Sequence, residues 1–276
     1  MILFFAPGGR LGNLLFQVSF LESIRRPRER IFTINLFRVH RIFPGLRRYY
    51  NTDFRPFTRL VDKVLNPLFR FLFVETRIFS SIVEKNAIQR IRKGLLPWRY
   101  VSGNFQIPYA GPSPIVLRSE PLQRASRVLA EAQDRVPVFV HIRRGDYEQF
   151  VVGGGIRPLL PGAFYQGALD WLLSRVPGAH VFLLGDSPGW ARELFGHLPH
   201  KTVSPLGPVE DLALMSLCHG GVISNSTFAW WGAALCRRQV PLVAPRYWLG
   251  WPAHRWWPVS IETSWITYLD VEALAP

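Results

Sequence analysis

The sequence has few cysteines, few lysines and no long apolar run. Its 276 residues include only two cysteines, Cys218 and Cys236, too few for a disulfide framework or a multi-cysteine zinc site, and this indicates a reducing compartment. The apolar start, Met1 to Ala6, is shorter than a signal-peptide core and far shorter than the roughly 20 residues of a membrane-spanning helix. We therefore expect a cytoplasmic protein and a buried strand at this position.

Negative charge is also scarce. There are 19 acidic residues against 33 basic ones, a net charge of +14, and only four of the basic residues are lysine. Arginine binds phosphate groups in a bidentate manner, although a GC-rich genome explains most of such an excess. The charge indicates an anionic partner: a nucleotide, a nucleic acid or an anionic membrane face. With 48% hydrophobic and 19% charged residues, the composition is globular and excludes disorder as the main state.

Metal-binding patterns are missing as well. The chain has no D-x-D motif of the kind that holds a metal–nucleotide complex, and its seven histidines are scattered without paired spacing. The sequence therefore predicts no metal site and no cofactor. If a diphosphate is bound, arginines and helix N-termini must neutralise its charge.

Short apolar strands alternate with helical stretches in the C-terminal half. This pattern of continuous apolar strands between helices predicts a parallel sheet covered on both faces. The N-terminal half is less regular, with no resolved pattern over 38–100 and a proline cluster at 108–114. We predict two α/β domains, 1–120 and 121–276, that meet near residues 110–130. The predicted strands are 2–5, 31–34, 136–142, 180–184, 202–204, 221–223 and 240–244, and the predicted helices are 13–24, 161–174, 188–195, 210–217 and 228–236.

Polar clusters follow four of the predicted strands. These clusters are residues 8–13, 143–147, 185–187 and 224–227. Ligands of open α/β sheets bind beyond the carboxyl ends of the strands. Four such clusters in one chain predict a shared cleft between the two domains.

Each cluster also has a purely structural explanation. The arginine pair at 143–144 could form a surface salt bridge, or direct one arginine to a cleft and the other to Asp146. Residues 224–227 could be only a helix N-cap, and Asp186 could cap the helix after it. The glycine-rich turn at 8–12 is neither a dinucleotide fingerprint nor a P-loop. Six tryptophans between residues 230 and 257 favour core and inter-domain packing over sugar stacking.

Taken together, five colinear motifs between residues 8 and 233 resemble those of the α-1,2-fucosyltransferases (glycosyltransferase family 11 type). Among the departures from the family pattern, Leu14 stands where a Gln usually follows the first motif, Asn104 replaces Tyr, Gly185 replaces Ser, and Ser187 replaces the second acid of the D-D pair. The motifs are Gly8-Gly-Arg-Leu-Gly-Asn13 (similar to G-G-x-L-G-N), Gly103-Asn-Phe-Gln106 (G-Y-F-Q), His141-Ile-Arg-Arg-Gly-Asp-Tyr147 (H-x-R-R-x-D), Val181-Phe-Leu-Leu-Gly-Asp-Ser-Pro-Gly-Trp190 (F-S-D-D-x-x-W) and Ser224-Asn-Ser-Thr-Phe-Ala-Trp-Trp-Gly-Ala233.

The resemblance implies a GT-B fold, in which two Rossmann-like domains face a cleft. It implies inverting, metal-independent transfer of L-fucose from GDP-β-L-fucose to a glycan hydroxyl, commonly galactose O2, in α-1,2 linkage. Residues 121–276 would bind the GDP-sugar, and residues 1–120 would form the acceptor side.

The resemblance also assigns roles by position. Arg143 would hold the donor diphosphate, and His141 is the second candidate catalytic residue. His141 and Asp186 would lie near the nucleoside, whereas Arg144 and Asp146 would be a supporting pair. The other implied site residues are Asn225, Ser226 and Thr227 along the donor, and Gly9, Gly12 and Asn13 from the other domain.

The lack of a membrane anchor separates this chain from Golgi-type relatives, so we expect a bacterial cytoplasmic enzyme. Its expected acceptor is an oligosaccharide or a lipid-linked glycan. A basic surface would then meet the anionic inner membrane as a peripheral contact. Three alternatives stay open: another GDP-sugar donor, such as GDP-colitose or GDP-L-galactose; a catalytically silent GDP-sugar- or carbohydrate-binding protein; and nucleic-acid binding, which only the charge suggests and which we do not expect.

Overall fold

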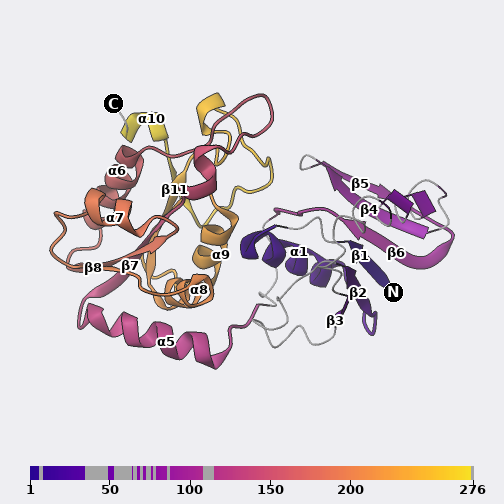
Figure 1. Ribbon diagram of the computed structural model, residues 1–276, viewed down its shortest axis with the longest axis horizontal. Coiled ribbons are helices and arrows are strands. Elements are labelled where there is room, and N and C mark those ends of the chain that lie inside the picture. Colours follow the sequence, from indigo (N-terminus) through magenta and orange to yellow (C-terminus); the bar gives the residue numbers. More distant parts are fainter. Residues whose placement is uncertain are drawn as a thin grey trace. The chain divides into compact units, whose positions relative to one another are not determined.

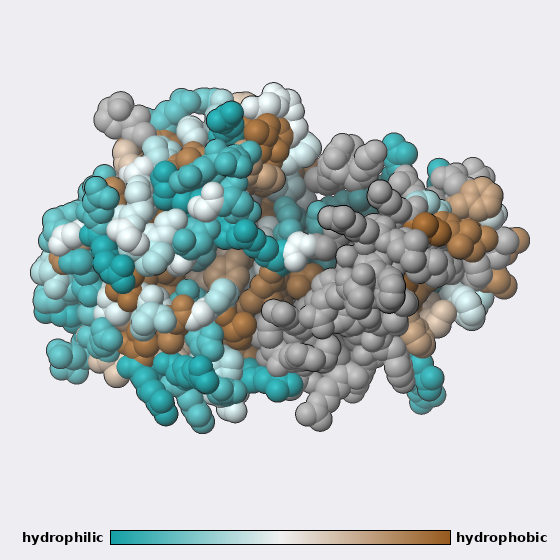
Figure 2. Space-filling view, in the orientation of Figure 1, coloured by the Kyte–Doolittle hydropathy of each residue, from teal (hydrophilic) through white to brown (hydrophobic). Residues whose placement is uncertain are grey.

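The computed structural model describes residues 1–5, 9–34, 49–52, 79–85, 88–107 and 115–274, with 64, 67–68, 71–72 and 76 between them. The chain divides into two compact units, Met1–Leu117 and Arg118–Pro276 (Figure 1). The domain boundary predicted from the sequence lies between residues 120 and 121. Hydrophilic residues cover most of the visible face of the second unit (Figure 2). No helix in the described ranges has the length and apolar character needed to cross a bilayer.

The first unit is a sheet with strand order β3-β2-β1-β6-β4-β5. Its strands pair in parallel, except that β5 at the edge runs antiparallel to β4. One long helix, α1 (Leu11–Ile24), follows β1 and buries Leu15, Phe16, Val18 and Leu21. The strands are β1 (Ile2–Phe5), β2 (Ile31–Ile34), β3 (Tyr49–Thr52), β4 (Phe79–Lys85), β5 (Ile88–Arg92) and β6 (Leu96–Ser102).

The second unit is an entirely parallel sheet with strand order β12-β11-β10-β7-β8-β9. Its strands are β7 (Val136–Ile142), β8 (Ala179–Gly185), β9 (Lys201–Val203), β10 (Gly220–Ile223), β11 (Leu242–Pro245) and β12 (Thr267–Leu269). Its α-helices are α5 (Ser119–Leu129), α6 (Gly162–Leu173), α7 (Pro188–Leu194), α8 (Pro208–Leu217), α9 (Thr227–Leu235) and α10 (Val271–Leu274), and its 3-10 turns are η5 (Ala130–Ala132), η6 (Gly145–Glu148) and η7 (Trp251–Ala253).

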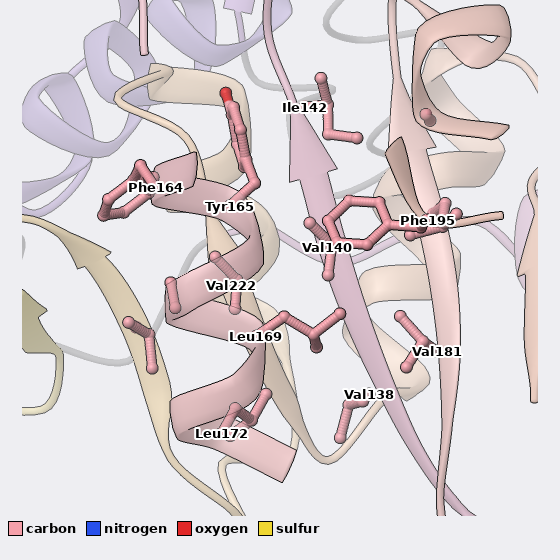
Figure 3. Close-up of a cluster of buried hydrophobic side chains, with 14 of the residues drawn as sticks. Val138, Val140, Ile142, Phe164, Tyr165, Leu169, Leu172, Val181, Phe195 and Val222 are labelled. Carbon is pink, nitrogen blue, oxygen red and sulfur yellow. The ribbon is translucent and has the colours of Figure 1, made fainter. Parts of the chain in front are cut away.

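The central strand β7 is buried on both faces. Val138, Val140 and Ile142 point to the side of α6, where they join Phe164 and Leu169 in one apolar core (Figure 3). Side chains alternate along a strand, so His141 points to the opposite face, where it lies against Phe228 of α9. Helices therefore cover both faces, and the predicted doubly wound α/β fold is confirmed for this unit.

In each sheet the chain fills one side of its first strand before it crosses to the other side. In the second unit β7 leads outward to β8 and β9, whereas β10 starts the other half on the opposite side of β7. In the first unit β1 stands between β2 and β6. Such reversal points open a crevice at the carboxyl ends of the strands, where open α/β proteins bind ligands. Both units therefore offer a binding position at a place fixed by topology.

Candidate functional site

The cluster after β7 is built around the guanidinium of Arg143. Its Nη1 lies 2.9 Å from Oδ2 of Asp186, and its Nη2 pairs with Oδ1 of Asp146. The Arg143 side chain is only 13% exposed, and its buried Nε has no hydrogen-bond partner among the described residues. Charge-assisted bonds of this kind are short and directional. The two carboxylates therefore fix the guanidinium at the end of the strand.

Asp186 joins the ends of β7 and β8. Besides its pair with Arg143, its Oδ1 accepts a hydrogen bond from the backbone N–H of Arg144 at 2.9 Å. The alternative role as a helix cap is not what the structure has, because Ser187 is the N-cap residue of α7.

Two glycines permit this close approach of the strand ends. A Cβ on Gly185, whose φ is +132°, would lie 2.0 Å from the carbonyl oxygen of Ile142, and one on Gly145 would lie 2.7 Å from Oδ2 of Asp186. Glycine has no Cβ and tolerates positive φ. The replacement of the family's serine by Gly185 therefore has a structural reason.

Arg144 makes different contacts from those of Arg143. Its guanidinium lies 4.5 Å from the ring centroid of Trp190 and 3.4 Å from Oε1 of Glu148. The structure pairs Asp146 with Arg143, and the supporting role expected for Arg144 and Asp146 stays a prediction. The η6 turn explains these contacts, because it brings Asp146 close to Arg143 and Glu148 close to Arg144.

His141 is buried between β7 and β10. Only 3% of the residue is exposed, and its Nδ1 lies 2.9 Å from the hydroxyl oxygen of Ser224. Burial lowers the pKa of His141 to about 4, although the nearby carboxylate of Asp186 acts in the opposite direction. The imidazole is therefore neutral at pH 7, and it ties the end of β7 to the segment after β10.

That segment, Ser224 to Thr227, leads into α9. Asn225 is buried, and its Nδ2 donates to the carbonyl of Pro158 at 2.7 Å, whereas its own carbonyl accepts from the Tyr147 hydroxyl at 3.2 Å. Its buried Oδ1 has no hydrogen-bond partner in the described part of the chain. Ser226 accepts from the N–H of Phe228 at 3.3 Å, so the N-cap explanation is confirmed for this residue. The N-terminus of α9 also directs positive partial charge to this strand end.

The two sequence motifs of the first unit meet each other. Asn13, at the start of α1, accepts a hydrogen bond from Gln106 at 3.1 Å, and Gln17 donates to Asn104 at 3.3 Å. Gly9 and Gly12 flank the start of the same helix. These residues lie at the reversal point between β1 and β6. Gly8 lies outside the described residues, and a shared cleft with the second unit stays a prediction.

Three residues with no predicted role lie in the second unit's cluster. The Tyr165 hydroxyl accepts from the N–H of Arg143 at 3.3 Å, and burial raises its pKa. Tyr147 carries the bond to Asn225, and Trp190 lies under Arg144. Tyr147 and Trp190 are the last residues of two of the quoted motifs, so the motifs could have pointed to both residues as part of the site. Tyr165 belongs to a helix whose spacing indicates only core packing.

The tryptophan cluster serves mainly as core. Trp230, Trp231 and Trp248 are buried, which confirms the core-packing interpretation for these three. Trp251 donates from Nε1 to the carbonyl of Pro158 at 3.1 Å, the same oxygen that Asn225 contacts. Among the residues that the structure describes, no three His, Cys, Asp or Glu side chains are grouped to hold a metal ion.

Comparison with known proteins finds a family match in the second unit. Residues 122–258 match the model of glycosyl transferase family 11. This segment of the chain is therefore similar to glycosyl transferase family 11. The family 11 segment contains Arg143, Asp186 and the 224–227 turn, which are the parts of the site described above for the second unit.

Similar sequences carry related names. The chain is 34% identical over 115 residues to the O-antigen biosynthesis glycosyltransferase WbnK of Escherichia coli, and 32% identical over 117 residues to an alpha-1,2-colitosyltransferase of the same species. It is also 32% identical over 104 residues to galactoside 2-alpha-L-fucosyltransferase SEC1 of Bos taurus. These alignments cover 40%, 40% and 36% of this chain and only 38%, 40% and 28% of those proteins.

The fold resembles that of solved glycosyltransferases. The glycosyl transferase family 9 protein from Veillonella parvula matches with a TM-score of 0.52 at 12% identity, over 89% of this chain and 80% of that one. At this identity the likeness concerns the fold alone. It agrees with the predicted GT-B fold, which is thereby confirmed as the fold class.

Proposed function

We propose that this protein transfers L-fucose from GDP-β-L-fucose to a glycan hydroxyl, galactose O2, forming an α-1,2 linkage with inversion at the anomeric carbon. The observation that carries the proposal is the arginine that two carboxylates hold at the reversal point of the second sheet. The match to the family 11 model and the relatives named for α-1,2 transfer support the same reaction.

The chemistry requires stabilisation of a leaving diphosphate. The bond between the anomeric carbon and the β-phosphate oxygen breaks, and its electron pair leaves with GDP. The acceptor oxygen attacks the opposite face of the sugar and loses its proton as the new bond forms. Negative charge grows on the diphosphate in the transition state, so fixed positive groups at that place lower the barrier.

In this proposal Arg143 and the N-terminus of α9 supply that positive charge. Asp146 and Asp186 hold the guanidinium in place, so little reorganisation is needed when charge develops. This supports a metal-independent mechanism, which we propose as part of the function. Asn225, Ser226 and Thr227 would line the donor from the same strand end.

His141 takes a different part. Its imidazole is buried and has a pKa of about 4, whereas an effective general base has a pKa near the working pH. We therefore assign His141 the positioning of Ser224 through their 2.9 Å hydrogen bond. Gly9, Gly12 and Asn13 would approach the diphosphate from the first unit. The acceptor would be an oligosaccharide or lipid-linked glycan, on the cytoplasmic side of a bacterial membrane.

A second donor has specific support. The relative named as an alpha-1,2-colitosyltransferase is 32% identical over 117 residues, so GDP-colitose is the alternative donor on the same scaffold. Contacts to the sugar ring would decide between the two donors, whereas both donors would make the same contacts through the diphosphate.

The test is a transfer assay with purified protein. GDP-fucose, GDP-colitose and GDP-L-galactose are incubated with galactose-terminated oligosaccharides in the presence of EDTA, and GDP release and product mass are followed. The proposal predicts a product heavier by one deoxyhexose from GDP-fucose, formed despite EDTA and with its α-1,2 linkage visible by NMR. Faster transfer from GDP-colitose would show that GDP-colitose, and not GDP-fucose, is the preferred donor. Binding of GDP without turnover of any donor would instead indicate a silent binding protein.

A further inference from the structure

The positive charge of the chain is concentrated in the first unit. Met1–Leu117 contains 19 of the 33 basic residues but only six of the 19 acidic ones, which gives this unit a net charge of +13 and leaves +1 for Arg118–Pro276. Arg143 and Arg144, at the proposed donor site, belong to the second unit. Donor binding therefore leaves the charge excess of the first unit without a role.

Exposed apolar side chains are concentrated in the same unit. Of the twelve large apolar side chains that are exposed among the described residues, eight lie between residues 64 and 98. Figure 2 shows hydrophobic residues at the surface where Figure 1 places β4, β5 and β6. The most exposed are Leu95, at 90%, and Ile91, at 69%, and both Leu96 and Trp98 are 46% exposed.

The two kinds of residue meet in residues 90–98, which we call the 90–98 patch. This patch runs along the edge strand β5, through the turn that follows it, and into the start of β6. Arg90 and Lys93 are exposed between the apolar side chains, and residues 88–98 contain no acidic residue. Leu95 lies in the turn, Ile91 in β5, and Leu96 and Trp98 in β6. The cations lie next to these apolar residues in the sequence.

We propose that the 90–98 patch docks on the surface of an anionic lipid bilayer. Exposed leucine and isoleucine side chains gain free energy by entering the boundary between headgroups and acyl chains. Tryptophan favours the same interfacial depth. Each Lys or Arg near an anionic surface adds about 1 kcal/mol of attraction. The unit's +13 charge complements such a surface over a wider area.

Two other partners fit the patch less well. Nucleic-acid surfaces use aromatic side chains on which bases stack, whereas three of the four exposed apolar residues here are aliphatic. A protein strand could add to the open edge of β5, but cationic side chains on an edge strand oppose such pairing. The combination of aliphatic tip and flanking cations favours lipid.

The test is cosedimentation of the full-length protein with vesicles. Wild-type protein is expected to bind vesicles of phosphatidylcholine with phosphatidylglycerol, to bind pure phosphatidylcholine at least ten-fold more weakly, and to lose affinity as salt rises. Arg90→Ala with Lys93→Ala should weaken binding roughly 10- to 30-fold. Leu95→Ser, alone and with Leu96→Ser, should weaken it at least several-fold. Leu95 is almost fully exposed, so its replacement does not disturb the core.

Matched controls come from the second unit. Val259→Ser removes another exposed apolar side chain, and Arg127→Ala with Arg192→Ala removes two exposed cations; both controls should bind vesicles like wild type. Unchanged thermal unfolding shows that a variant is folded. The proposal is overturned if wild type does not bind anionic vesicles, if the patch variants bind as wild type does, or if the patch changes alter only oligonucleotide binding or self-association. Because the readout involves no sugar donor, the result is independent of the proposed transfer reaction.

Discussion

Arg143 and Arg144 are adjacent in sequence and differ in what surrounds them. Arg143 is held by Asp146 and Asp186 at the carboxyl end of β7, whereas Arg144 rests on the ring of Trp190. The sequence motif alone does not separate their roles. The geometry does, because only a guanidinium fixed by two anchors is organised in advance for a developing negative charge.

Replacement of Arg143 should therefore affect the chemical step. Arg143→Ala is expected to lower kcat for fucosyl transfer on the order of 10²–10³-fold, the usual cost of removing one preorganised donor. Arg143→Lys should restore little, since an ammonium cannot reproduce the bidentate geometry. Arg144→Ala, the matched control, should lower kcat less. Steady-state kinetics would contradict this role if Arg143→Ala turned over at a near-normal rate.

At the scale of elements, the buried carboxyl group of Asp211 in the first turn of α8 gives the fold a measurable pH dependence. Asp211 is 7% exposed and accepts a hydrogen bond from Ser204. Burial raises the pKa of Asp211 to about 7, whereas an unfolded Asp has a pKa of about 3.9. The folded state therefore binds the proton more tightly, and this contribution to stability is lost as pH rises from about 4 to about 7.

Asp211→Asn should remove that dependence. Between pH 5 and pH 8, the free energy of unfolding of the wild type is expected to fall by about 2–3 kcal/mol relative to that of the variant. Urea unfolding at both pH values measures it. The comparison of the two proteins cancels the opposite trend from His141, whose lowered pKa favours the folded state at higher pH. A difference that stays constant with pH would contradict the assignment.

Most elements of the second unit were predictable from sequence because they are continuous apolar strands between helices. The predicted 136–142 strand is β7, and the predicted 161–174 helix is α6 within one residue at each end. Helix α5 was missed because the proline cluster at 108–114 indicated a connection between domains near residues 110–130, where this helix begins. Strands β3 to β6 were missed because basic, aromatic and proline residues interrupt the alternation there.

The site was predictable in position but not in contacts. Residues 143–147, 185–187 and 224–227 were expected at strand ends, and the structure has them there. Their pairing depends on the η6 turn and on the close approach at Gly145 and Gly185, which no local pattern shows. The pairing of Asp146 with Arg143 could therefore not be predicted from the sequence.

On the scale of the whole molecule, the two units differ in net charge and in exposed apolar residues, and we assign them different roles. The first unit has a charge of +13 and the exposed 90–98 patch, whereas the nearly neutral second unit has Arg143 and the α9 N-terminus. We therefore assign membrane contact to the 90–98 patch of the first unit and the main contact with the donor diphosphate to Arg143 of the second. Changes in the 90–98 patch should leave GDP binding intact, and replacement of Arg143 should leave vesicle binding intact.

The most direct measurement is GDP affinity by calorimetric titration of three proteins. Wild type should bind GDP, and Arg143→Ala should bind about 10- to 100-fold more weakly, the cost of losing a charge-assisted hydrogen bond. Arg90→Ala with Lys93→Ala, which removes the same kind of charge from the first unit, should bind GDP as wild type does. Equal GDP affinity of wild type and Arg143→Ala would contradict the claim that the strand ends of the second unit hold the donor.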